Sequence, residues 1–233
     1  MRDYFLDQIR AAEKHYTRAL KKDSVKDIYQ LRVAIRRLRM ILQLLKTNKA
    51  KTLKASELKS VNRIWKALGK LRDLDVALEN AHAFGLDTTM LKRERKKAYP
   101  KILSKLKTGK LDVIIKSLEK LSKKINDEDL KPKSLAQKLL KDLDRKYSSI
   151  TDLHELRIVL KKTRYLLESL EVPITQFKIY QTVLGELNDL ENLLHTFKKD
   201  KAVTAAKERK LALAKKIVGP AQKLAIKKLS ALP

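Results

Sequence analysis

The sequence predicts an all-α protein made of two four-helix bundles, which are related by internal duplication about a pseudo-two-fold axis. Three observations support this. Apolar residues recur at helical spacing nearly throughout the 233 residues. Glycine and proline number five each, too few for a sandwich, a barrel or a loop-rich fold. Two motifs also recur in the same order in the two halves of the chain. Each half should therefore be a bundle of long antiparallel helices joined by short turns.

The first half of the chain is predicted to form five helices. In the second of them, apolar residues step by four, three, four and three along one face: Leu31, Ile35, Leu38, Leu42 and Leu45. Asp23 or Ser24 can cap this helix. The third helix stops at Gly85, and the fourth ends near Gly109, with Pro100 expected to kink or break it. The predicted ranges are 2–22, 25–47, 56–84, 88–107 and 110–124.

The second half begins after a local acidic cluster and is predicted to form four helices. The cluster, Asn126 to Asp129, is followed by Pro132, and we place the boundary between the halves there. Ser149 or Thr151 and then Pro173 mark turns, and Gly219-Pro220 is expected to interrupt the last helix. The predicted ranges are 133–147, 152–170, 174–197 and 201–229. The first bundle repeat is thus 1–125, and the second is 131–233.

The internal repeat is visible in two sequence motifs. Residues 28–45 read IYQLRVAIRRLRMILQLL, and residues 153–170, which lie 125 positions later, read LHELRIVLKKTRYLLESL. Residues 68–78 read LGKLRDLDVAL, and residues 184–194 read LGELNDLENLL. Two motifs that recur in order are much stronger evidence for duplication than one.

The charge balance predicts a polyanionic partner. Lysine and arginine total 55 and acids total 27, which gives a formal net charge of +28. Clustered cations gain affinity by displacing the counterions of a polyanion. A solubility surface or a thermophile's composition is the alternative explanation. Cysteine is absent, which excludes disulfides, thiolate metal sites and a cysteine nucleophile. The chain lacks an apolar run of membrane-spanning length and a signal-peptide start, so we expect a cytoplasmic location.

The basic residues of the second helix form a stripe beside its apolar face. Arg32, Arg36 and Arg39 are spaced i, i+4, i+7, and Tyr29 precedes them by three residues. The repeat reproduces the stripe as His154, Arg157, Lys161 and Arg164. Because like charges one turn apart repel, such a stripe needs either compensating acids or an anionic ligand. Acids follow in the next helix of each half and are interpreted as structural partners of arginines in a neighbouring helix: Asp73, Asp75, Asp189 and Glu191. The alternative for Asp73 and Asp189 is that they hold a ligand-binding arginine in place.

Further basic residues belong to other predicted helices. Arg63, Lys66 and Lys70 share a face of the third helix. Trp65 of the same helix is expected to be a core residue. The run from Lys92 to Lys97 is interpreted mainly as solvated surface. No nucleotide-binding, nucleophile-elbow or metal-ligand motif is present, and we find no cluster of acids facing the basic stripes that could hold a catalytic metal. We therefore predict a binding protein without catalytic residues, metal or cofactor, and interpret His15, His82 and His195 as surface or core-edge residues.

The segments LRVAIRRLR, LGKLRDLDV, LHELRIVLKKTRY and LGELND, in that order, resemble the CHAD domain, the conserved histidine α-helical domain, over nearly the whole chain. The resemblance implies one domain of two four-helix bundles with a basic, pore-like centre that binds inorganic polyphosphate, and an association with polyphosphate granules. Tyr29 stands where the first motif of the family normally carries histidine. The chain lacks the E-x-E-x-K motif of the triphosphate-tunnel domain often fused to this family, so it resembles a stand-alone binding module.

The predicted function is binding of long-chain inorganic polyphosphate by paired basic helix faces that line a central groove or pore. The alternatives are a nonspecific RNA or DNA backbone-binding protein and a protein-interaction scaffold. Because aromatic residues make up only 5% of the chain and do not interleave with the basic ones, a base-stacking platform is not indicated. No membrane partner is expected. The predicted polyphosphate-binding residues are Tyr29, Arg32, Arg36, Arg37, Arg39, Arg63, Lys66, His154, Arg157, Lys161, Lys162 and Arg164.

Overall fold

The computed structural model describes residues 1–22, 24–108, 110–147, 149–198 and 200–232, and these residues contain nine α-helices, one 3-10 helix and no strand. The predicted all-α class is therefore confirmed. Two predicted boundary residues, the alternative cap Asp23 and the helix end at Gly109, lie outside the described residues.

The chain divides into two compact units that are not two uninterrupted stretches of sequence. The first unit comprises residues 1–78 and 87–131, and the second comprises residues 79–86 and 132–233. The C-terminal end of α3 thus groups with the second unit. The first unit otherwise contains α1, Arg2–Lys21; α2, Val25–Thr47; α3, Ala55–Ala83; α4, Thr89–Thr108; α5, Leu111–Lys124; and the 3-10 helix η1, Glu128–Leu130.

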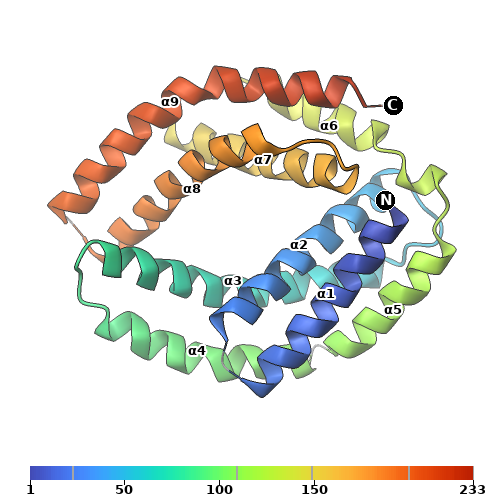
Figure 1. Ribbon diagram of the computed structural model, residues 1–233, viewed down its shortest axis with the longest axis horizontal. Coiled ribbons are helices and arrows are strands. Elements are labelled where there is room, and N and C mark those ends of the chain that lie inside the picture. Colours follow the sequence, from blue (N-terminus) through green and yellow to red (C-terminus); the bar gives the residue numbers. More distant parts are fainter. Residues whose placement is uncertain (23, 109, 148, 199, 233) are drawn as a thin grey trace. The chain divides into compact units, whose positions relative to one another are not determined.

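Within the first unit, α1 packs along α2 and also against α5 (Figure 1). The apolar stripe predicted for α2 is buried at all five positions, from Leu31 to Leu45. It packs with apolar residues of the neighbouring helices, such as Phe5 and Ile9 on α1. Burial of this continuous stripe is the main stabilising contribution of α2, since each large apolar side chain contributes about 1.5–3 kcal/mol.

The α2 and α3 helices run antiparallel, as two pairs of contacts show. Tyr29, early in α2, lies against Arg72, late in α3. Arg39, further along α2, bonds to Asn62, which is nearer the start of α3. Ser24 caps α2, because its hydroxyl oxygen accepts a hydrogen bond from the backbone N–H of Asp27 at 3.1 Å.

The second unit contains α6, Lys133–Leu143; α7, Ile150–Ser169; α8, Thr175–Thr196; and α9, Lys201–Ser230. In it, α9 packs against all three other helices, and α7 packs against α6 and α8. Ser149 caps α7 in a full capping box, in which the side chains of Ser149 and Asp152 each accept a hydrogen bond from the other residue's backbone N–H.

Helix boundaries agree with the prediction to within two residues, except at the end of α6. This helix was predicted to reach residue 147 but ends at Leu143. The cause is a contact from α9, which the local sequence does not reveal. The amide nitrogen of Gln222 donates to the backbone carbonyls of Leu143 and Arg145 at 2.9 and 3.0 Å. These bonds satisfy carbonyl groups that a longer helix would have used internally.

Two predicted helix breaks do not occur, and the alternative of a kink at Pro100 stays a prediction. The α4 helix continues through Pro100, and α9 continues through Gly219-Pro220. A proline inside a helix leaves the carbonyl group four residues earlier without its usual donor. These carbonyls belong to Lys96 and Lys216, and both lysines and both prolines are exposed, so water can satisfy the carbonyl oxygens. The helical packing of α4 and α9 therefore outweighs the local cost.

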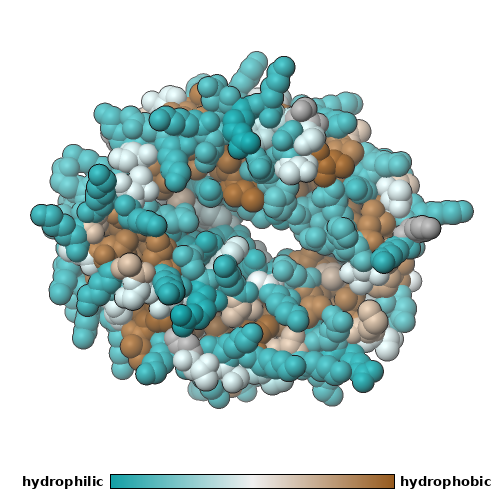
Figure 2. Space-filling model, turned by 180° about the vertical axis from the view of Figure 1, so that it is seen from behind, coloured by the Kyte–Doolittle hydropathy of each residue, from teal (hydrophilic) through white to brown (hydrophobic). Residues whose placement is uncertain are grey.

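On the face of the protein seen in Figure 2, hydrophilic side chains cover most of the surface, with smaller hydrophobic areas between them. Among the described residues, no helix combines the length and apolarity needed to cross a membrane. Lysines are spread over most helices, so the net charge alone does not mark one surface as a binding site.

Candidate functional site

The basic face of α2 is organised around one aromatic residue of α3. The guanidinium carbon of Arg39 lies 4.1 Å from the centre of the Trp65 ring, and that of Arg32 lies 5.4 Å from the same centre. The Nε atom of Arg39 donates to Oδ1 of Asn62 at 2.6 Å. Trp65 was predicted to be a core residue but is only half-buried. It supports two of the predicted binding arginines by cation–π contacts.

Arg39 is a cation held in an unfavourable electrostatic environment. Burial lowers the pKa of Arg39, and the nearby charge of Arg36 lowers it further. The guanidinium remains protonated, because an arginine pKa stays far above neutral pH. An anion beside Arg36 and Arg39 would offset both the desolvation and the repulsion. This arrangement stabilises a bound anion more than an isolated surface arginine would.

Tyr29 and Arg37, two further predicted residues of α2, contact different helices. Tyr29 is exposed at the start of α2, with the Arg72 guanidinium carbon 5.2 Å from its ring centre. Arg37 instead reaches towards α1, where its NH1 atom donates to Oε1 of Gln8 at 3.2 Å. Arg37 therefore lies apart from the group formed by Arg39 and Trp65, although it is adjacent in sequence to Arg36.

In the second unit, the predicted residues lie on α7, with support from α8. The Nδ1 atom of His154 lies 3.0 Å from Oδ1 of Asn188, so His154 is held by α8 while its ring remains exposed. The NH2 atom of Arg164 donates to the hydroxyl of Tyr165 at 2.7 Å, and its guanidinium also lies over that ring. Three further predicted binding residues are partly exposed on the same helix: Arg157, Lys161 and Lys162.

Two of the four predicted acids, Asp75 and Glu191, pair with the helix that follows their own, whereas Asp189 accepts a 3.3 Å hydrogen bond from the side chain of Asn188 in its own helix. Asp75 is buried, and its Oδ1 atom accepts a 2.8 Å hydrogen bond from Arg95 of α4. Glu191 of α8 pairs with Lys207 of α9 at 3.5 Å. The run from Lys92 to Lys97 is exposed as predicted, with Arg95 as the exception because Asp75 draws it inward. Asp75 and Glu191 thus compensate cations outside α2 and α7.

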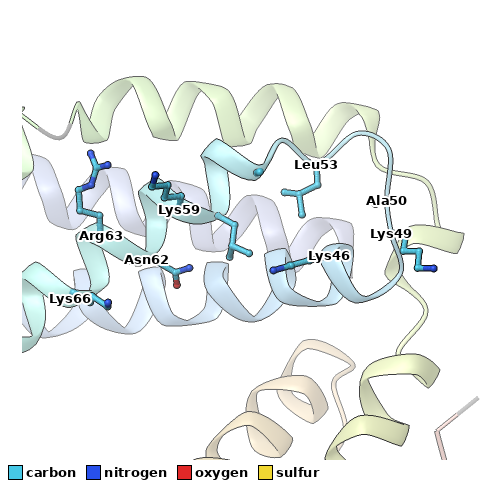
Figure 3. A pocket seen from close by; sticks show the side chains of 10 residues that line it. Lys46, Lys49, Ala50, Leu53, Lys59, Asn62, Arg63 and Lys66 are labelled. Carbon is cyan, nitrogen blue, oxygen red and sulfur yellow. The ribbon is translucent and has the colours of Figure 1, made fainter.

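A pocket of about 670 Å³ adds residues that the sequence interpretation did not include. It lies where α2 ends and α3 begins, and its lining contains Arg63 and Lys66, which were predicted (Figure 3). Lys46, Lys49, Lys59 and Asn62 also line it. The spacing of Lys59, Arg63 and Lys66 by four and three residues was a signal that α3 carries a longer basic stripe.

His15 is partly buried, as expected of a core-edge residue, and it bridges two helices. Its Nδ1 atom lies 2.8 Å from Oδ1 of Asp27. The hydrogen bond from His15 lowers the pKa of Asp27, and the one from Ser24 adds to this. Over the described ranges, no group of three or more histidine and acidic side chains is placed to hold a metal ion.

Comparison with known proteins adds family and fold information. Residues 3–198 match the family model described as the CHAD domain. A crystal structure of the CHAD domain from the plant Ricinus communis has a TM-score of 0.67 and 18% identity, covering 100% of this chain and 91% of that chain. PptA from Streptomyces chartreusis has a TM-score of 0.59 and 17% identity, covering 98% of each chain. At these identities, the two structures show a shared fold. The search of curated proteins found no match.

Proposed function

The chain belongs to the CHAD domain family, and on that premise we propose that it binds inorganic polyphosphate through the basic faces of α2 and α7. The observation that carries this proposal is the environment of Arg39. Its guanidinium is partly desolvated, lies beside Arg36, and is fixed by Trp65 and Asn62. A fixed cation of this kind has lost hydration and side-chain entropy before the ligand arrives, so less free energy is spent on binding.

The chemistry of the two faces suits a phosphate polymer. Arginine offers a planar fork of N–H donors for phosphate oxygens, and lysine offers a mobile point charge. Tyr29 and His154 add hydrogen-bond donors at matching positions. A linear chain of identical units does not require a fixed register along such a face. We therefore expect affinity to increase with chain length and to fall steeply with salt.

Sequence repetition supports a more specific arrangement. The motifs of α2 and α3 recur in α7 and α8, and we propose that the protein arose by duplication of a four-helix unit, with repeat boundaries at 1–125 and 131–233. The family resemblance supports the further proposal that the two basic faces line one groove or pore and contact one polyphosphate chain. Loss of binding from substitutions in either unit alone would support this arrangement.

We also propose that the protein acts by binding rather than by catalysis. The basic faces provide cations and hydrogen-bond donors, whereas phosphoanhydride hydrolysis normally uses a metal ion held by carboxylates. The test is incubation with long-chain polyphosphate, with and without Mg²⁺ or Mn²⁺, followed by measurement of released phosphate and of chain length. Chain shortening that scales with protein concentration would contradict this proposal.

Nucleic-acid backbone binding is the second candidate, because the charge of +28 will attract any polyanion. The decisive experiment is competition at fixed, near-physiological salt. Labelled long-chain polyphosphate is bound and then challenged with short polyphosphate, single-stranded RNA or duplex DNA at matched phosphate concentration. We expect only long polyphosphate to compete well. Equal competition by RNA or DNA would overturn the proposed specificity, because the protein would then recognise charge density alone.

A further inference from the structure

The pocket between the end of α2 and the start of α3 concentrates positive charge in a concave site. Five cations line it: Lys46, Lys49, Lys59, Arg63 and Lys66. In the part of the chain that the structure describes, none of the five has an ion-pair partner, whereas Arg95 and Lys207 do. No acidic residue lines the pocket. A concave surface lined by one sign of charge focuses the electrostatic field and attracts an anion.

The nearest acid in sequence forms no ion pair with the five cations of the pocket, within the residues that the structure describes. Glu57 is buried at the start of α3. Its carboxylate accepts a hydrogen bond from the backbone N–H of Lys54 at 3.0 Å and another from the hydroxyl of Ser117 at 2.7 Å. The positive charge of the pocket is therefore available to a ligand.

Besides the cations and Asn62, the lining consists of four apolar residues, which restrict the class of ligand. They are Ala50, Leu53, Ala55 and Leu58. A linear inorganic phosphate chain has no apolar part to cover these side chains, whereas an organic phosphate does. We propose that this pocket binds a nucleoside di- or triphosphate, with its phosphates on the lysines and Arg63 and its organic part on the apolar surface. The volume of about 670 Å³ is within the roughly 300–1,000 Å³ typical of small-molecule sites.

The connecting segment between the two helices is tied in place, so the pocket is formed without a ligand. The side-chain amide of Asn48 donates to the backbone carbonyls of Asp129 and Lys131, both at 2.8 Å. Lys49 adopts a left-handed backbone conformation with φ of 55°. The backbone N–H of Ala50 then donates to the carbonyl of Leu45 at 2.9 Å. Such preorganisation reduces the entropy cost of binding.

This inference goes beyond the proposed function because it concerns a different ligand class and mostly different residues. Arg63 and Lys66 are shared with the predicted polyphosphate residues, whereas Lys46, Lys49 and Lys59 are not. Substitution of these three lysines therefore tests the pocket while leaving the arginines of α2 intact. Loss of nucleotide binding and loss of polyphosphate binding can then be measured separately.

The first experiment is calorimetric titration of the full chain with adenosine triphosphate in the absence of divalent metal, at about 0.1 M salt. The pocket variant combines Lys46→Ala, Lys49→Ala and Lys59→Ala. The matched control removes three exposed lysines from α4 of the same unit, through Lys92→Ala, Lys96→Ala and Lys97→Ala. We expect the pocket variant to bind at least about tenfold more weakly and the control less than about twofold. Equal weakening in both variants, or no binding by the unmodified protein, would overturn the proposal.

The second experiment compares adenosine triphosphate with inorganic tripolyphosphate, which lacks the organic part. We expect adenosine triphosphate to bind about tenfold more tightly, with Leu53→Ser removing most of that advantage. Equal affinity for both ligands would contradict a nucleotide site. Long-chain polyphosphate binding should persist in the triple-lysine pocket variant. Parallel loss of both ligands would instead show that the pocket is part of the polyphosphate surface, which would overturn a separate site.

Discussion

Near its start, α2 contacts α3 and α7 contacts α8 through corresponding positions of the repeated motifs. The side chains at these positions differ between the two units. In the first unit, Tyr29 lies against the guanidinium of Arg72. In the second, His154 is hydrogen-bonded to Asn188, and these two residues occupy the corresponding positions of the repeated motifs. An aromatic–cation contact in one unit is thus replaced by a polar hydrogen bond in the other. Helix packing preserves the contact between positions, while the chemistry at those positions is free to differ.

The arginines at the far end of each stripe show the same pattern. Arg39 lies over Trp65, which belongs to the neighbouring helix α3. Arg164, its counterpart, lies over Tyr165 of its own helix. The position that matches Trp65 holds Gln181, whose amide donates to the backbone carbonyl of Leu160 at 2.8 Å. Both arginines are supported by an aromatic ring, but only the first depends on a second helix for it.

Helix capping provides a third comparison between the units. Ser24 and Asp27 recur 125 residues later as Ser149 and Asp152, and both serines cap their helices. The carboxylate of Asp152 closes the capping box on the backbone N–H of Ser149. The carboxylate of Asp27 instead contacts His15 of α1. The first unit therefore uses this acid to join two helices, whereas the second uses it within one helix end.

The strongest test of whether the two faces act together is charge reversal in each unit. We expect Arg36→Glu and Lys161→Glu each to weaken long-chain polyphosphate binding by at least about tenfold, and the double variant by about a thousandfold, because each change replaces attraction by repulsion. Filter binding or calorimetry at fixed salt would measure this. An effect confined to one unit would show that the two faces are not equivalent.

Matched controls for charge reversal are available in both units. Lys97 on α4 and Lys215 on α9 are exposed and lie outside the predicted site. Their replacement by glutamate produces the same change in net charge. We expect each control to weaken binding by no more than about threefold. Losses equal to those of Arg36→Glu and Lys161→Glu would mean that binding follows net charge and not a defined surface.

The second largest effect should be a loss of stability at Trp65, which supports Arg39, compared with a smaller loss at the matching residue Gln181. We expect Trp65→Ala to lower the free energy of unfolding by about 2–4 kcal/mol, because it removes a large half-buried ring and its contacts with Arg32 and Arg39. Gln181→Ala should cost about 1–2 kcal/mol, through loss of one buried hydrogen bond. Urea unfolding followed by circular dichroism measures both values.

A conservative variant tests the contribution of the aromatic ring at position 65. Trp65→Phe retains an aromatic face and should recover more than half of the stability lost in Trp65→Ala. It should also retain polyphosphate affinity within about threefold. If Trp65→Phe and Trp65→Ala bind polyphosphate equally weakly, contact with the arginines is not what matters at this position.

The sequence predicted the helices well because their signals are local. Apolar spacing, glycine, proline and capping residues placed eight of the nine helices to within two residues at each end. The exceptions depend on distant parts of the chain or on solvent. The early end of α6 follows from a contact made by Gln222, and the continuity of α4 depends on the exposure of the carbonyl freed by Pro100.

The candidate site was only partly predictable for the same reason. Helical spacing was enough to place Arg32, Arg36 and Arg39 on one stripe. It did not reveal that Trp65 would support two of them, because that requires the register between α2 and α3. The pocket was missed because its shape depends on how the segment between these helices folds over α3. Helical spacing also could not predict that Arg37 bonds to Gln8 of α1, because this contact depends on how α1 packs against α2.

The comparison of helix ends predicts a difference in acid sensitivity. The contact with His15 lowers the pKa of Asp27 below its ordinary value. A carboxyl group with a lowered pKa stabilises the folded state above its unfolded pKa of about 4, and this contribution is lost as pH falls through the folded value. We expect His15→Ala to reduce stability at pH 6 and to make the decline below pH 4 less steep. Thermal unfolding between pH 3 and pH 7 would test this.

A variant of Asp152 allows the acid sensitivity of the two units to be compared. Asp152→Ala removes the corresponding carboxylate without affecting His15. It should lower stability at pH 6 while leaving unchanged the part of the acid response that depends on His15. If His15→Ala has the same pH profile as the unmodified protein, the contact between His15 and Asp27 does not contribute to stability.

The smallest expected effect comes from exchanging Tyr29 and His154. Both side chains can hydrogen-bond to a phosphate oxygen, so we expect Tyr29→His and His154→Tyr each to change polyphosphate affinity by less than about twofold. Alanine at either position should weaken binding by about two- to threefold, because one hydrogen bond to the ligand is lost. Calorimetry at constant pH and ionic strength measures these affinities. His195→Ala is the control, since it removes an exposed histidine outside the predicted site. Because Arg72 and Asn188 remain in place, unchanged affinity in both alanine variants would show that this pair of positions contacts its neighbouring helix without contacting the ligand.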